Sequence, residues 1–244
     1  MNITKILDEA IAPALPATLD VVATVCLDGV TGAVVPGVGN MLLAYQQKQQ
    51  EKRFNQALVE LKNRQEEIDS ILKNYEEELK PLIEKMLDIY FQYSLKNSQE
   101  EKVKYLGNGY VNSISVERPQ EDVILGFYDT LDQVNILDIR VLKLYCGDVF
   151  EVRDNYEKVM EDFGIDYSQY KMIRLKLERL GLLESKNDIK QDENIGYIID
   201  YLNAQSKNKI SDAKRALGKM KKIPNGETFK VTKYGINFMR FIYR

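Results

Sequence analysis

The chain contains no histidine and no tryptophan, and only two of its 244 residues, Cys26 and Cys146, are cysteines. Without histidine it cannot form a Ser-His-Asp triad, use imidazole as a general base or bind a metal through imidazole. The two cysteines lie far apart in the sequence, which gives neither a disulfide framework nor the ligand spacing of a zinc site. We therefore expect no metal and no cofactor, and the scarcity of cysteine favours a cytoplasmic protein.

Motifs of other enzyme classes are also absent. The sequence has no nucleophile elbow, no phosphate-binding loop and no pair of carboxylates in a pattern that indicates an acid-base site. Asp28 is a lone carboxylate in apolar surroundings, which is more typical of a helix cap than of an acid-base site. We expect a protein that is not an enzyme and has no small-molecule substrate.

Charge is missing from part of the N-terminal segment, because residues 29–45 contain no Asp, Glu, Lys or Arg. A membrane span needs about 20 mostly apolar residues, but this stretch is rich in Gly, Ala and Val, and Pro36 should kink it. Two alternatives stay open: a broken segment associated with the inner membrane, or a buried helical hairpin. The candidate residues for membrane contact or self-association are Gly29, Gly32, Pro36, Gly37 and Gly39.

Apolar residues recur with alternating spacings of four and three between Phe54 and Tyr93. Such a heptad repeat forms one apolar seam along a helix, and the seam needs a partner helix from the same chain or from a second copy. Pro81 should end the first helix near Leu79 and begin another. The candidate oligomerisation seam consists of Phe54, Leu58, Leu61, Ile68, Leu72 and Leu79.

The net charge of -3 is the sum of a long acidic segment and a shorter basic segment. Residues 165–244 hold 17 Lys and Arg against 9 Asp and Glu, a balance of +8, whereas the preceding residues hold 17 against 28. This split predicts a Gly-rich apolar region (1–45), an acidic helical bundle or coiled coil (46–131) and a basic domain (132–244). A basic domain is a candidate for contact with a polyanion such as DNA.

Two stretches of the basic domain show a recognisable order of secondary structure. "LKLERLGLLES" (residues 175–185) ends a helix expected over 169–180 and leads through a Leu-Gly-Leu turn into a strand, and "FKVTKYGINFMRFI" (229–242) is a strand followed by a closing helix. In this order the domain resembles a winged helix-turn-helix domain. The connection between the two strands is much longer than a usual wing and contains helical stretches at 194–203 and 211–220. The fold class expected for the whole chain is mainly α, with an N-terminal helical hairpin, heptad helices and a C-terminal winged helix with a small β-wing.

The resemblance implies two sets of residues that would contact DNA. The helix over 169–180 would enter the major groove, and the long connection would add backbone contacts. Alternatively these basic faces are simply solvated and the module binds protein. The candidates are Lys171, Arg174, Lys176 and Arg179 on the helix, and Lys207, Lys209, Lys214, Arg215, Lys219, Lys221 and Lys222 in the connection.

Two functional hypotheses follow. The first is a non-enzymatic effector or assembly protein with a membrane- or self-associating N-terminus and a winged-helix sensor or adaptor. The order of its parts resembles uncharacterised prophage and abortive-infection proteins of the Abi-alpha type, which implies phage defence. The second is a winged-helix transcriptional regulator whose heptad helices join two protomers. The expected partners are a second copy or a helical protein, with DNA and membrane as further candidates.

Overall fold

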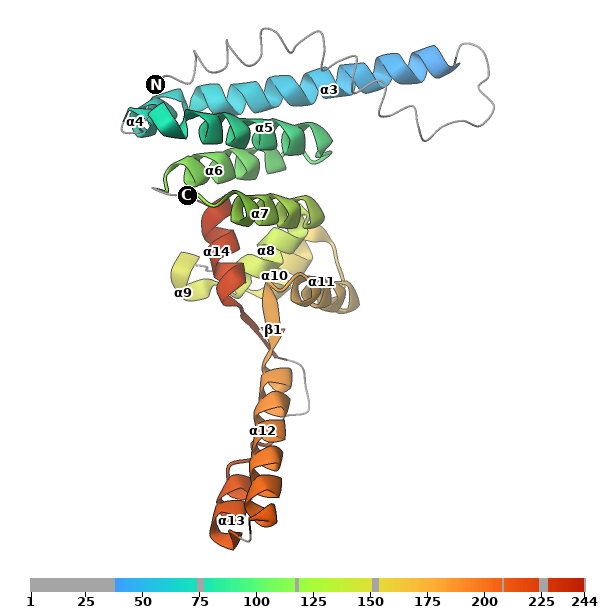
Figure 1. Ribbon diagram of the computed structural model, residues 1–244. Helices are drawn as coiled ribbons and strands as arrows, with labels where there is room; N and C mark the ends of the chain where they lie inside the picture. The colour runs from blue at the N-terminus through green and yellow to red at the C-terminus, as the bar shows by residue number, and fades with distance from the viewer. Residues whose placement is uncertain are drawn as a thin grey trace. The chain divides into compact units, whose positions relative to one another are not determined.

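The chain is mainly α-helical, as predicted, and a two-stranded sheet is the β-structure found in the described residues (Figure 1). The computed structural model describes residues 38–73, 77–116, 119–150, 154–207, 209–223 and 228–243. It divides into two compact units. Unit 1 comprises Met1–Ile136 with Arg240–Arg244, and unit 2 comprises Leu137–Met239.

Unit 1 is a layered set of helices in which α3, α5 and α6 lie side by side and α7 packs against α5 and α6 (Figure 1). Three tyrosines, Tyr90, Tyr110 and Tyr128, are fully buried in its core. The Tyr90 hydroxyl donates to the Ala57 carbonyl at 2.9 Å, which satisfies a buried polar group. Its elements are α3 (Val38–Asn63), α4 (Gln65–Leu72), the 3-10 turn η1 (Glu77–Leu79), α5 (Lys80–Lys96), α6 (Lys102–Ile114) and α7 (Glu121–Gln133).

The predicted helix reaching to about Leu79 is wrong. The chain leaves the helix at Arg64, whose φ of -110° and ψ of 10° separate α3 from α4. The break falls beside Gln65, a polar residue that occupies the position of the heptad repeat between Leu61 and Ile68. Pro81 does lie in the first turn of α5, as predicted, where the missing amide hydrogen costs no helical bond.

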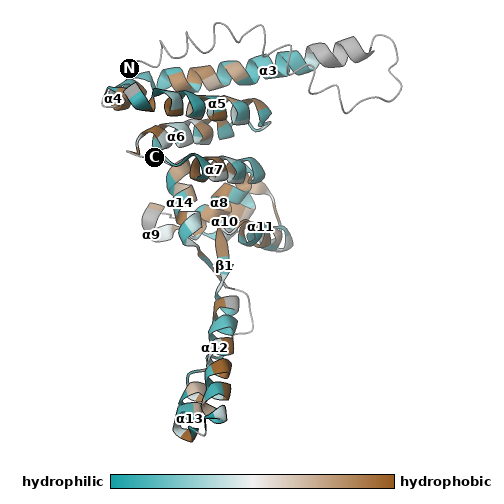
Figure 2. Ribbon diagram, in the orientation of Figure 1, coloured by the Kyte–Doolittle hydropathy of each residue, from teal (hydrophilic) through white to brown (hydrophobic). Residues whose placement is uncertain are grey.

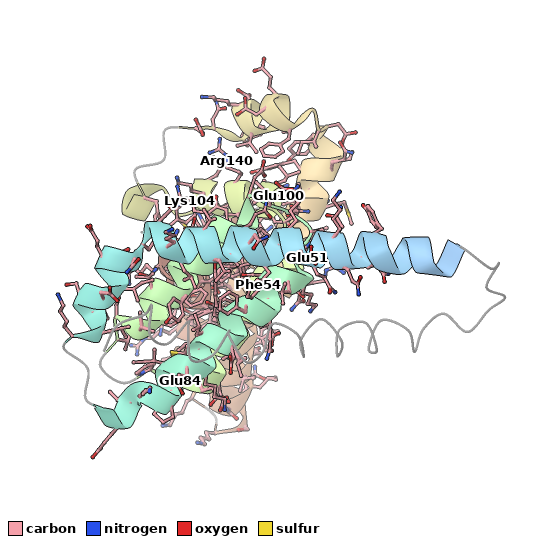
Figure 3. The ribbon with its side chains drawn as sticks, turned by 90° about the horizontal axis from the view of Figure 1, so that it is seen from above. Glu51, Phe54, Glu84, Glu100, Lys104 and Arg140 are labelled. Atoms are coloured by element: carbon pink, nitrogen blue, oxygen red, sulfur yellow. The ribbon has the colours of Figure 1, made fainter. Side chains whose placement is uncertain are left out.

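Residues of the heptad seam pack against other helices of unit 1. Leu61, Ile68 and Leu72 are at most 1% exposed in unit 1. Phe54, labelled in Figure 3, is half-buried, and its ring lies 5.2 Å from that of Phe91 on α5. Leu58 and Leu79 are also half-buried.

Close packing at α6 depends on two glycines. A Cβ atom at Gly107 would lie 2.7 Å from Glu60 Cγ, and one at Gly109 would lie 2.6 Å from the Phe241 ring. Asn108 also donates to the Ile242 carbonyl at 2.6 Å. The glycines therefore allow α6 to approach both α3 and the last residues of the chain.

Unit 2 contains helices around the antiparallel pair β1–β2, in which Leu183 is opposite Val231. The predicted strand near 228–232 and the predicted closing helix are confirmed. Helix α11 begins earlier than predicted, because Asp166 and Gln169 form a reciprocal capping box. The elements are α8 (Ile136–Leu144), α9 (Gly147–Phe150), α10 (Tyr156–Phe163), α11 (Tyr167–Arg179), β1 (Leu183–Ser185), α12 (Lys186–Ser206), α13 (Ile210–Gly218), β2 (Phe229–Val231) and α14 (Lys233–Ile242).

The predicted membrane or self-association residues are mostly beyond what the structure describes. Gly29, Gly32, Pro36 and Gly37 lie outside the described residues, and Gly39 lies in the first turn of α3. Within the described ranges, each helix is too short or too polar to cross a lipid bilayer.

Candidate functional site

The four basic residues predicted on α11 do not share one exposed face. Arg174 is only 8% exposed. Its guanidinium carbon lies 5.1 Å from the ring centroids of Tyr170 and Phe229 and 5.7 Å from that of Tyr167. Such cation–π contacts hold the guanidinium inside an aromatic cluster. Arg174 therefore joins α11 to β2 instead of facing a ligand.

Lys176 is also used internally. Its ammonium forms an ion pair with Asp138 of α8, and the Asp138 side chain is 2% exposed. A carboxylate buried this deeply needs a cation beside it. Of the predicted α11 set, Lys171 and Arg179 are the exposed residues.

Helices α12 and α13 form a hairpin between β1 and β2, and the two helices lie side by side (Figure 1). Small side chains face the contact, since Ala204, Ala213 and Ala216 are at most 9% exposed. Asn194 of α12 clamps the chain after α13, because its side chain accepts from the Lys221 amide at 2.7 Å and donates to the Lys221 carbonyl at 2.8 Å. The hairpin is thus held by close helix packing and by a two-bond clamp.

The outward side of α13 is cationic. At about 100° per residue, Lys214 and Arg215 lie opposite the inward-facing Ala213 and Ala216. Asp212 is the single acidic residue between positions 207 and 222. All seven predicted cations are exposed: Lys207, Lys209, Lys214, Arg215, Lys219, Lys221 and Lys222.

These cations differ in what they contact. Lys221 forms an ion pair with Glu193 at 2.5 Å, and the Lys219 ammonium lies 6.0 Å from the Tyr197 ring centroid. Among the described residues, Lys214, Arg215 and Lys222 form no ion pair. The structure therefore places a larger group of exposed cations on the hairpin, at Lys214 and Arg215 of α13 and at Lys222 after it, than on α11, where Lys171 and Arg179 are exposed.

The hairpin also carries an apolar surface that the sequence analysis missed. Ile195, Ile198, Ile199 and Leu202 of α12 are between 41% and 57% exposed. Their spacing of three, four and seven residues places them on one face, a pattern that is visible in the sequence. Figure 2 shows hydrophobic colouring along α12. We call these residues the α12 stripe.

The described residues provide no metal site, since no cluster of His, Cys, Asp and Glu side chains among them could hold an ion. Burial raises the pKa of the Cys146 thiol to about 11, so the reactive thiolate is scarce at neutral pH. No family model, curated protein or solved structure matches this chain. The exposed surfaces of the hairpin are therefore the candidate functional site.

Proposed function

We propose that the chain is a non-catalytic adaptor that binds duplex DNA through the outward face of α13. The observation that carries the proposal is the exposed cationic surface around Lys214 and Arg215. Positively charged side chains on one helix face attract phosphates and release counterions on binding. The overall balance of +8 in residues 165–244 supports the same partner.

The position of the hairpin supports a winged-helix interpretation of unit 2. Helix α11, strand β1, strand β2 and helix α14 follow one another in the order of that domain, and the α12–α13 hairpin occupies the place of the wing. A wing that carries lysines on its outer surface is suited to contact with the phosphate backbone.

The expected mode of binding depends little on DNA sequence. Phosphate contacts fix position but carry no base information. Arg174 and Lys176, which a recognition helix would use for base contacts, are occupied by the aromatic cluster and by Asp138. From the transcriptional-regulator hypothesis we therefore keep DNA binding, but through the phosphate backbone and not through the bases. The membrane-effector hypothesis stays a prediction, because residues 1–37 are not described.

The double substitution Lys214→Glu and Arg215→Glu tests the proposal. Fluorescence anisotropy with a labelled duplex should show binding by the full chain that weakens as salt rises. We expect the variant to bind at least about tenfold more weakly, and the slope of log affinity against log salt to fall by about two.

The matched control is Lys62→Glu with Lys104→Glu, which changes the net charge equally at exposed lysines of unit 1. Lys104 is labelled in Figure 3. We expect the control to retain most of the affinity. Equal weakening by both variants would mean that only the overall charge matters, and the assignment to α13 would be rejected.

A further inference from the structure

The α12 stripe is an apolar helix face that no described part of the chain covers. Leu202 is 57% exposed, Ile195 is 54% and Ile199 is 52%. The stripe lies away from α13, because Ala204, which is 9% exposed where α12 packs on α13, lies almost opposite the centre of the stripe at about 100° per residue. Four large aliphatic side chains in one row on a charged hairpin are typical of an interaction surface.

The order of residues in the stripe is self-complementary. If two α12 helices run antiparallel about a two-fold axis between positions 198 and 199, Ile198 of one copy lies opposite Ile199 of the other. Ile195 then lies opposite the second copy's Leu202. A two-fold interface requires the same patch to match itself in this way.

Charges at the two ends of the stripe favour the same orientation. Asp192 is exposed about one turn before Ile195, and Lys207 is exposed just after α12 ends. An antiparallel pair brings each Asp192 towards the second copy's Lys207, whereas a parallel pair would place like charges together.

From these observations we infer that two copies of this chain associate through an antiparallel pairing of their α12 stripes. The inference rests on α12 alone and is independent of DNA binding by α13. The stripe is only about two turns long, so the contact belongs with small, reversible interfaces. The dimer should therefore form and dissociate with protein concentration.

Sedimentation velocity of the full chain without DNA, over a series of concentrations, tests the inference. We expect the weight-average sedimentation coefficient to rise from a monomer to a dimer value. Ile198→Glu with Ile199→Glu, at the two-fold axis, should weaken dimerisation at least tenfold. Leu217→Glu is the control, because Leu217 is 46% exposed on α13, outside the stripe. It should leave dimerisation unchanged.

A charge exchange tests the orientation and does not depend on the apolar variants. Asp192→Lys should weaken the dimer, and adding Lys207→Asp to the same chain should restore it. A chain that stays monomeric at all concentrations would overturn the inference and leave the stripe to a different protein. A dimer unaffected by Ile198→Glu with Ile199→Glu, or one that the charge exchange fails to restore, would overturn it as well.

Discussion

Gly235→Ala is expected to lower the free energy of unfolding by about 3 kcal/mol. A Cβ atom at this position would lie 2.3 Å from the Leu182 carbonyl oxygen and 2.9 Å from Val231 Cγ2. The Leu182 oxygen cannot move away easily, because it accepts from the Thr232 amide at 3.1 Å. Alanine normally gains up to about 1 kcal/mol over glycine inside a helix, which is too little to offset the collision.

Urea denaturation followed by circular dichroism measures this effect, and Gly196→Ala is the matched control. Gly196 also lies inside a helix, but beyond its chain neighbours and the adjacent backbone of α12 no atom lies within 4 Å of the position its Cβ would take. The control should be as stable as the parent chain or slightly more stable. If Gly235→Ala unfolds at the same urea concentration as the parent, α14 does not contact Leu182 as described.

Lys176→Met is expected to destabilise the chain by about 2–3 kcal/mol. It removes the ammonium from beside Asp138, whose side chain is 2% exposed. Removing one partner of a buried ion pair costs about 3–5 kcal/mol of stability. We expect a smaller loss here, because the Lys176 side chain is 34% exposed. Arg179→Met, at an exposed position of the same helix, should change stability by less than about 0.5 kcal/mol.

The combined variant Lys176→Met with Asp138→Leu separates charge from packing. Removing both charges avoids an unbalanced buried carboxylate, so the double variant should recover part of the lost stability. Chemical denaturation of the four chains in this cycle gives the coupling energy. A coupling energy near zero would show that the pair does not stabilise unit 2.

The elements that could be predicted from the sequence are those with strong local signals. The order of residues 229–242 predicts a strand and then helix α14, and in the structure the Thr232 hydroxyl accepts from the Gly235 amide at 2.8 Å at the start of that helix. The turn at Pro81 is equally local, since proline restricts its own backbone.

Features that depend on contacts between distant residues could not be predicted in this way. Arg174 has the spacing of an exposed helix residue, and its burial depends on Phe229, which is far along the chain. The partner of Lys176 is Asp138, a buried residue of another helix, and the spacing of residues on α11 does not indicate that ion pair. The α12 stripe differs from these basic residues, because its apolar side chains stay exposed. Its helical spacing is present in the sequence, but apolar spacing alone does not distinguish a core face from an exposed one.

Lysine footprinting of the full chain distinguishes DNA contact through α13 from DNA contact through α11. The full chain is acetylated with and without saturating duplex DNA, and the modification of each lysine is measured by mass spectrometry. We expect DNA to protect Lys214 and Lys222, while Lys62 and Lys104 of unit 1 react equally in both samples. Protection of Lys171 on α11 with no change at Lys214 and Lys222 would mean that DNA contacts α11 and not α13.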